Sequence, residues 1–220
     1  MKLKSLAKYL LVSFAFSSFF SLIGTSVSAN TRTARFVCQY NLNMGFYETI
    51  AVAVESGEKT PPIITWEIRT APDWQPKERC EEVSRRLDRA YVQFNYEMRK
   101  IMLKPGVHNG FPIICVTQNP QWDCQGGDTL VTILSNNSRE DRSVTEKLND
   151  AEKALEVLYN RLQNVADVTL PPLRQSNGQK VLNLGVAIER MFSSPHNSRS
   201  FGGNSGGGSN TPTTPNDPWK

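Results

Sequence analysis

Four cysteines carry the clearest chemistry in this 220-residue sequence: Cys38, Cys80, Cys115 and Cys124. An even number of cysteines in an exported chain favours disulfide bonds over free thiols. The sequence contains no Cys-x-x-Cys pair, so it gives little support to a zinc site or a thioredoxin-like site. Three pairings can be drawn. We favour Cys38 with Cys80 and Cys115 with Cys124, because the second pair lies on neighbouring segments that can fold back on each other.

Histidine and carboxylate chemistry has few candidates. A Ser-His-Asp or Cys-His site needs a histidine beside the nucleophile, and the sequence has only His108 and His196. The first lies in a predicted turn and the second in a predicted tail. Glu78 and Glu82 share a helix face, as a pair of glycosidase carboxylates can, but neighbouring lysines and arginines favour a salt-bridged surface. We therefore assign no catalytic residues.

The segment from Trp122 to Asp128 is the best candidate for a small-ligand site. The carboxylates of Asp123 and Asp128, together with backbone carbonyls and two glycines, can wrap a Ca²⁺ or Mn²⁺ ion. A metal-binding protein or a metal-dependent hydrolase is therefore the alternative function. The segment lacks the ligand spacing of an EF-hand, and a turn pinned by a disulfide explains the glycines equally well.

Two tryptophans in predicted loops, Trp74 and Trp122, are candidate binding residues. An exposed indole can stack on a sugar ring or contact an apolar patch of a partner. A buried indole that anchors its loop is the competing interpretation. If either residue is exposed, the sequence predicts a binding module for an envelope protein or a glycan, without a cofactor.

The elements that must position these residues are predicted by hydrophobic periodicity. Apolar residues at helical spacing, namely Cys80, Val83, Leu87 and Tyr91, indicate an amphipathic helix over 76–94 that begins at Pro76. Turn-forming residues occupy 104–112, and Asn109-Gly110 there predicts a tight hairpin. Alternating or continuous apolar residues predict strands at 35–40, 47–54, 63–68, 113–116 and 130–134.

The C-terminal part is predicted to be helical. Ser143 and Glu146 form a capping-box signature at the start of a long helix over 143–165. A short final helix or strand is predicted within 181–192. The expected fold class is therefore α+β, a small antiparallel sheet of about five strands packed by one or two helices and held by two disulfides.

Both ends of the sequence differ in composition from this folded part. Residues 1–29 begin with lysines, continue with an apolar stretch and end in small residues, which predicts a cleaved signal peptide, with an uncleaved anchor as the alternative. Cleavage removes three lysines and no acidic residue, so the formal net charge falls from +4 to +1. This balance argues against nucleic-acid binding. Residues 193–220 are rich in glycine, serine and proline, which predicts a disordered tail.

A set of short motifs resembles the circadian oscillating protein family of cyanobacteria. They are Phe36-x-Cys38, the strand around Trp66, the helix motif from Pro76 to Ser84, the run from Asn109 to Val116, and Cys124 followed by the strand from Leu130 to Leu134. The match covers roughly residues 35–135. It implies an exported cyanobacterial envelope protein that associates peripherally with a membrane. It supplies no catalytic residue, because the molecular activity of the family is not established.

Together these interpretations divide the chain into a signal peptide at 1–29, a disulfide-stabilised α+β domain at 30–142, a helical extension at 143–192 and a tail at 193–220. The predicted function is a non-catalytic binding or structural module. The predicted location is the periplasm, the thylakoid lumen or the extracellular space, with peripheral contact to a membrane.

Overall fold

The computed structural model describes residues 33–67, 74–124, 126–133, 142–166, 169–170, 173–176 and 178–194. The predicted signal peptide and all but the first two residues of the predicted tail lie outside the described residues. The helices are α1 (Pro76–Gln93), α2 (Val144–Ala166), α3 (Leu184–Ser193) and the short 3₁₀ helices η1 (Met98–Lys100) and η2 (Gly126–Asp128). The strands are β1 (Ala34–Asn41), β2 (Phe46–Ala53), β3 (Ile64–Trp66), β4 (Met102–His108), β5 (Phe111–Thr117), β6 (Thr129–Thr132), β7 (Arg174–Ser176) and β8 (Gln179–Asn183).

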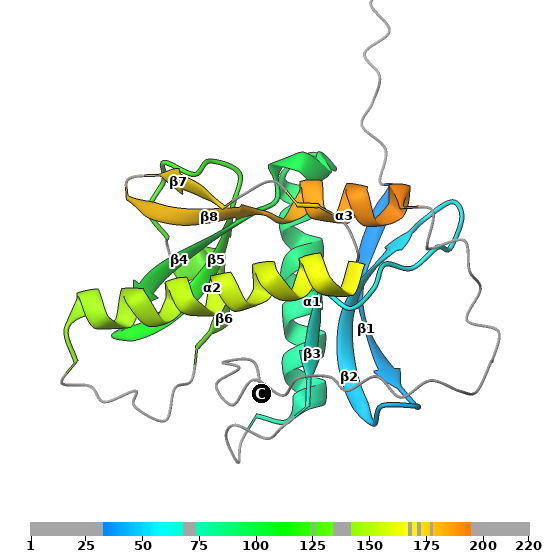
Figure 1. Cartoon of the computed structure of the whole chain (residues 1–220), viewed down its shortest axis with the longest axis horizontal. Coiled ribbons are helices and arrows are strands. Elements are labelled where there is room, and N and C mark those ends of the chain that lie inside the picture. Colours follow the sequence, from blue (N-terminus) through cyan, green and yellow to red (C-terminus); the bar gives the residue numbers. More distant parts are fainter. Residues whose placement is uncertain are drawn as a thin grey trace, which may run out of the picture.

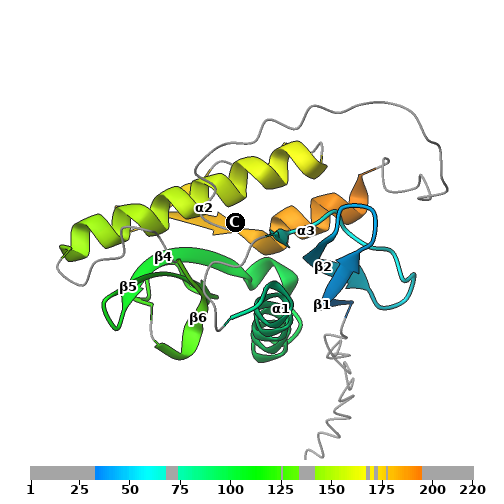
Figure 2. The same ribbon diagram turned by 90° about the horizontal axis from the view of Figure 1, so that it is seen from below.

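The described strands form two antiparallel sheets, one of three strands in the order β1-β2-β3 and one of five in the order β6-β5-β4-β8-β7. Helix α1 stands between the two sheets, and α2 runs across the second sheet (Figures 1 and 2). The α+β class and the two disulfides are confirmed. The expected single sheet is divided in two: β8 and β7 extend the second sheet beyond β4, and the β1–β2 hairpin pairs only with β3 among the described strands.

Helix α1 forms where its sequence pattern predicts it. Pro76 occupies the first turn, and Gln75 and Glu78 form a capping box that satisfies backbone N–H groups at this end. The predicted stripe of Cys80, Val83, Leu87 and Tyr91 is completely buried. Helix α1 packs against β1 and β2 on one side and contacts β5 and β6 on the other, so it joins the two sheets.

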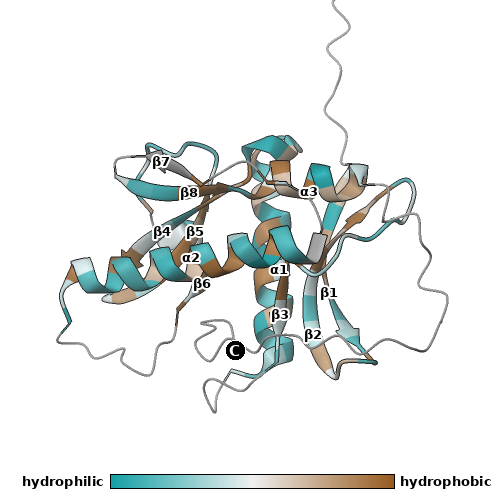
Figure 3. Ribbon diagram, viewed as in Figure 1, coloured by the Kyte–Doolittle hydropathy of each residue, from teal (hydrophilic) through white to brown (hydrophobic). Residues whose placement is uncertain are grey.

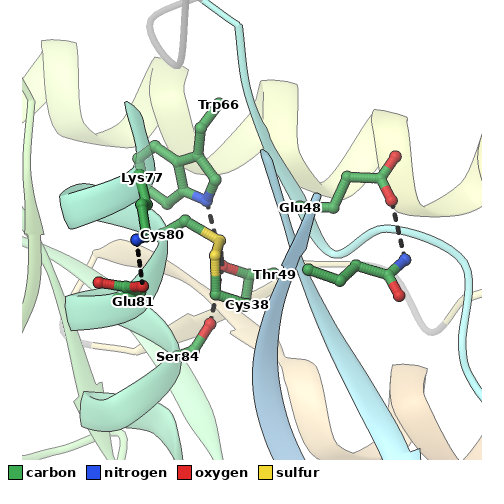
Figure 4. The surroundings of a disulfide bond; sticks show 9 residues. Cys38, Glu48, Thr49, Trp66, Lys77, Cys80, Glu81 and Ser84 are labelled. Carbon is green, nitrogen blue, oxygen red and sulfur yellow. Dashed lines mark hydrogen bonds and ion pairs between the residues drawn. A yellow bond between two sulfur atoms is a disulfide. The ribbon is translucent and has the colours of Figure 1, made fainter. Parts of the chain in front are cut away.

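A polar network fixes α1 to the first sheet inside this core. The indole N–H of Trp66 donates to Thr49 Oγ1 at 3.1 Å, and Ser84 Oγ donates to the same oxygen at 3.2 Å (Figure 4). Thr49 Oγ1 in turn lies 3.9 Å from Cys80 Sγ. The guanidinium of Arg79 lies over the Trp66 ring at 5.3 Å. The side chain of Trp66 is therefore a buried anchor, and its indole N–H is satisfied as burial requires.

The predicted helical extension is an integral part of the domain. The capping box of Ser143 and Glu146 is confirmed, because the Ser143 backbone N–H donates to the Glu146 carboxylate at 2.9 Å. This hydrogen bond is the main reason that the pKa of Glu146 is lowered. The buried leucines of α2 and the buried Leu184, Ala187, Ile188 and Met191 of α3 belong to the same core cluster as the apolar face of α1. Figure 3 shows the hydrophilic front of α2 over the hydrophobic strands of the second sheet.

The segment 181–192 contains both of the elements predicted as alternatives. Strand β8 ends at Asn183, whose side chain accepts from the Val186 N–H and so begins α3. Residues 104–112 were predicted as turns, yet most of them lie in β4. The Asn109-Gly110 hairpin turn is confirmed, with φ values of 50° and 78°.

Candidate functional site

Residues 118–124 and 126–128 lie between β5 and β6 and cover one side of the β4–β5 hairpin; we call them the clamped loop. Lys104 pairs with Cys115 in the β4–β5 register, and Gly106 pairs with Ile113, so these four residues share one side of the sheet. The Cys115–Cys124 disulfide attaches the clamped loop to this side. The favoured pairing of cysteines is thereby confirmed, since the other disulfide joins Cys38 to Cys80.

Small residues allow the clamped loop to approach the sheet closely. A Cβ atom at Gly106 would lie 2.8 Å from Cys124 Sγ, which is closer than van der Waals contact permits. A Cβ atom at Gly126 would lie 2.6 Å from Nε2 of His108, so the imidazole of His108 packs directly on the loop backbone. Both glycines therefore serve close packing, and His108 has a structural contact here.

A buried lysine lies beneath the clamped loop. The side chain of Lys104 is only 1% exposed, and its ammonium donates to the backbone carbonyl of Trp122 at 2.8 Å. The backbone carbonyl of the same lysine lies 3.8 Å from Cys124 Sγ. Lys104 thus contacts the loop at two points, and together with the disulfide it fixes the backbone on both sides of Asp123.

The clamped loop presents Trp122 to solvent. This side chain is 57% exposed, whereas the other candidate, Trp74, is half-buried at the start of α1. An indole held on a fixed backbone can bind a partner at a low cost in conformational entropy, because only its two side-chain torsions must be ordered. Of the two tryptophans, Trp122 is therefore the better candidate for a contact residue.

The carboxylates of the clamped loop do not gather into a cluster. Asp123 and Asp128 are both exposed, and within the described residues there is no group of three or more His, Cys, Asp or Glu side chains that could hold a metal ion. Their assignment as Ca²⁺ or Mn²⁺ ligands remains a sequence-based prediction.

A pocket lies between the clamped loop and α1. It is small, with a cavity volume of about 30 Å³, and its polar lining includes Arg86, Arg89, Gln93 and Asp128. Arg86 is already occupied, since its Nη1 donates to the carbonyls of Thr129 and Leu130 at 3.0 Å and its Nε donates to Glu82 at 2.6 Å. The arginine therefore links the helix to the edge strand β6.

The other candidates for catalysis have structural partners. Glu82 forms ion pairs with Arg85 and Arg86, and the hydrogen bond from Arg85 is the main reason that the pKa of Glu82 is lowered. Glu81 pairs with Lys77 at 3.8 Å (Figure 4). All four cysteines are in disulfides, so the protein has no thiol nucleophile in this state. His196 lies outside the described residues.

A second exposed feature, which sequence reasoning missed, is the tip of the β1–β2 hairpin. Tyr40, Leu42 and Met44 are 49%, 86% and 61% exposed. The turn is well defined, because the side-chain oxygen of Asn41 accepts from the backbone N–H groups of Asn43 and Met44 at 3.1 Å. The available signal is the uncharged, largely apolar run from residue 40 to residue 47.

The family model for circadian oscillating protein COP23 matches residues 35–190, more than two thirds of the chain. The chain belongs to the COP23 family. No curated protein and no solved structure matches the chain.

The extent of the COP23 match corrects the extent of the resemblance seen in the sequence. That resemblance ended near residue 135, but the family model continues through α2, β8 and most of α3. Both disulfides and the whole clamped loop lie inside the COP23 match. The disulfides indicate that this COP23 protein matures in an oxidising compartment. None of the helices in the described part of the chain is both long and apolar enough to cross a bilayer.

Proposed function

We propose that this COP23-family protein is an exported, non-catalytic binding module that holds an envelope protein or glycan through the clamped loop. The observation that carries the proposal is the exposure of Trp122 on a backbone fixed by the Cys115–Cys124 disulfide and by Lys104. Partners bind most strongly to large aromatic side chains that are already ordered before contact. The periplasm, the thylakoid lumen and the extracellular space are the compartments proposed for it.

The position of Trp122 also suits a glycan. An indole face stacks on a sugar ring, and the neighbouring Gln121 and Asp123 are exposed groups that can exchange hydrogen bonds with hydroxyls. An apolar patch on a protein partner would use the same indole without these polar neighbours. A glycan and a protein partner can therefore be distinguished by substitutions of these polar neighbours that leave Trp122 in place.

Replacing Trp122 by Ala is expected to weaken binding strongly while leaving the fold intact. We expect affinity to fall by at least about tenfold, which corresponds to about 1.4 kcal/mol, because a central tryptophan supplies much of the energy of a small interface. The measurement is a thermal-shift screen of the oxidised protein against envelope saccharides, followed by pull-downs from envelope extracts. Val144→Ala is the matched control, because Val144 is an exposed apolar residue on α2, outside the clamped loop. A Trp122→Ala protein that keeps every interaction of the wild type would place the binding site elsewhere.

Peripheral contact with a membrane is a second candidate function, and the hairpin tip favours it. Leu42 and Met44 project from a turn without charged residues, and the Tyr40 and Tyr47 rings, 4.9 Å apart, lie at its base. Aliphatic side chains at a tip and tyrosines behind it match the polarity gradient of a lipid interface.

The double substitution Leu42→Asp/Met44→Asp is expected to abolish sedimentation with neutral phospholipid vesicles, if the hairpin tip is the contact. Burial of these two side chains in a lipid interface would contribute about 3 kcal/mol, so its loss should lower the bound fraction by more than about tenfold. Vesicle co-sedimentation measures the effect, and Trp122→Ala is the control that should still bind. Equal binding by the aspartate variant and the wild type would remove this candidate.

A further inference from the structure

We propose that Cys115–Cys124 is an exchangeable disulfide that acts as a latch: reduction by a dithiol opens the clamped loop, and hydration of the buried Lys104 ammonium favours the open state. The inference goes beyond the proposed function, although its consequence for binding rests on that function.

The buried ammonium is the first observation. A lysine ammonium has three donors and is strongly hydrated in water, so burying it is unfavourable unless it is paired. Lys104 is 1% exposed, and its ammonium has the Trp122 carbonyl as its hydrogen-bond acceptor. The ion pairs found among the described residues do not include Lys104. The closed loop therefore confines a charge that would gain water on opening.

The second observation is that the two disulfides lie in different surroundings. Cys80 belongs to the hydrophobic core cluster and Cys38 packs against it, so exposing this bond requires α1 to leave the first sheet. Cys115 and Cys124 are outside that cluster, and their bond holds the clamped loop to the β4–β5 hairpin. Cys115 is fully buried and Cys124 is half-buried, as Cys80 and Cys38 are, so the two bonds differ in the elements they join and not in exposure. Local opening of a surface loop requires less free energy than separation of a helix from a core. The Cys115–Cys124 bond should therefore react first.

The dithiol alone supplies the electrons and protons that the exchange reaction needs. One thiolate of the dithiol attacks Cys124 Sγ, the sulfur–sulfur bond breaks, and Cys115 leaves as a thiolate that takes up a proton. The second thiolate of the dithiol then displaces Cys124 and closes the reagent into its own disulfide. Two electrons pass from the dithiol to the protein, and the products are two protein thiols and one oxidised reagent.

The first test is the order in which the two disulfides are reduced under native conditions. The full mature protein is treated with dithiothreitol, and thiols are alkylated at intervals and located by peptide mass spectrometry. We expect Cys115 and Cys124 to be alkylated at least about tenfold faster than Cys38 and Cys80. Equal rates, or earlier reduction of Cys38–Cys80, would overturn the latch.

The second test asks whether Lys104 favours the open loop. Hydrogen exchange of amides 118–128 is measured before and after selective reduction, in the wild type and in Lys104→Met. Reduction should lower protection in the wild type by at least about tenfold. Lys104→Met loses the hydrogen bond to the Trp122 carbonyl in both states, so each protein is compared with its own oxidised form. On that comparison Lys104→Met should lose much less protection on reduction than the wild type, because a methionine gains nothing from hydration. Lys104→Gln, which keeps a donor without the charge, is a second variant should the first fail to fold.

Lys147→Met is the matched control, because Lys147 is also buried but lies beside Gly110 and not beneath the clamped loop. It should lose protection on reduction as the wild type does. Equal loss of protection in the Lys104 variants and the wild type would show that the charge has no part in opening. These readouts involve no partner, so a failure of the latch can be distinguished from a failure of the binding proposal.

Discussion

A protein with Cys38 and Cys80 both replaced by Ala is expected to lose about 4 kcal/mol of stability. The disulfide closes a loop across a separation of 42 residues, and without it the unfolded chain gains the conformational entropy that this loop removes. For a domain of this size, such a loss lowers the unfolding temperature by about 10 °C or more. The effect should be global. This disulfide joins β1 to α1 beside the hydrogen-bonded Thr49, Trp66 and Ser84, so all of these contacts depend on the helix staying in place (Figure 4).

Urea unfolding followed by circular dichroism measures this loss. Cys115→Ala/Cys124→Ala is the matched control, and the shorter separation of nine residues predicts a loss of about 3 kcal/mol at most. In the control we expect the secondary structure and the α1 core to persist at moderate temperature. If the first double variant were as stable as the wild type, the disulfide would be redundant with the core that surrounds it.

Gly185→Ala is expected to destabilise the domain by about 3 kcal/mol or more, because the added methyl group has no room. A Cβ atom at this position would lie 1.7 Å from the backbone carbonyl oxygen of Met98. Neither side can move easily. The Gly185 N–H donates to the Ile101 carbonyl at 3.0 Å, and the two residues flanking Gly185 in the chain are Leu184, which is buried, and Val186, whose N–H is bonded to Asn183.

Gly127→Ala is the matched control for this substitution, because no heavy atom lies within 4 Å of the Cβ position there. It should change stability by less than about 0.5 kcal/mol. Thermal and urea unfolding of both variants give the comparison. A Gly185→Ala protein as stable as Gly127→Ala would mean that α3 does not pack against η1, and the C-terminal segment would then be peripheral after all.

Local patterns predicted the elements whose stabilising contacts are close in sequence. The α1 stripe, the Ser143 capping box and the Asn109-Gly110 turn all depend on residues within a few positions of each other, and all are found. The division into two sheets depends instead on pairing between Met102 and Asn183 and between Leu103 and Leu182. Nothing in a local pattern indicates a partner so distant in the chain.

Strand β4 was not predicted, because its residues are typical of a turn. Pro105 and Gly106 ordinarily indicate a turn, because proline lacks an N–H for a central strand. The pairing with β8 ends at Leu103, so Pro105 faces no strand on that side and its missing donor costs nothing there. Gly106 serves the close approach of Cys124. Once the strand is overlooked, the burial of Lys104 cannot be predicted.

The candidate site was foreseen only in part. Trp122 was correctly predicted to lie in a loop closed by Cys115 and Cys124, and its exposure argues against a buried anchor, while its role as a contact residue stays a proposal. Lys104 was missed because lysine is almost never buried without a partner in proteins. The hairpin tip was missed because the predicted strands 35–40 and 47–54 leave the residues between them as a mere connection, although Leu42 and Met44 there are exposed apolar side chains.

The order of the cysteines along the chain bears on how the protein matures. Each native bond joins neighbours in that order, the first cysteine to the second and the third to the fourth. Synthesis proceeds from the N-terminus, so Cys80 is the first partner that Cys38 meets, and Cys124 is the only one left for Cys115. A simple thiol oxidant is therefore sufficient, and the slow reshuffling that crossed pairings demand is not needed.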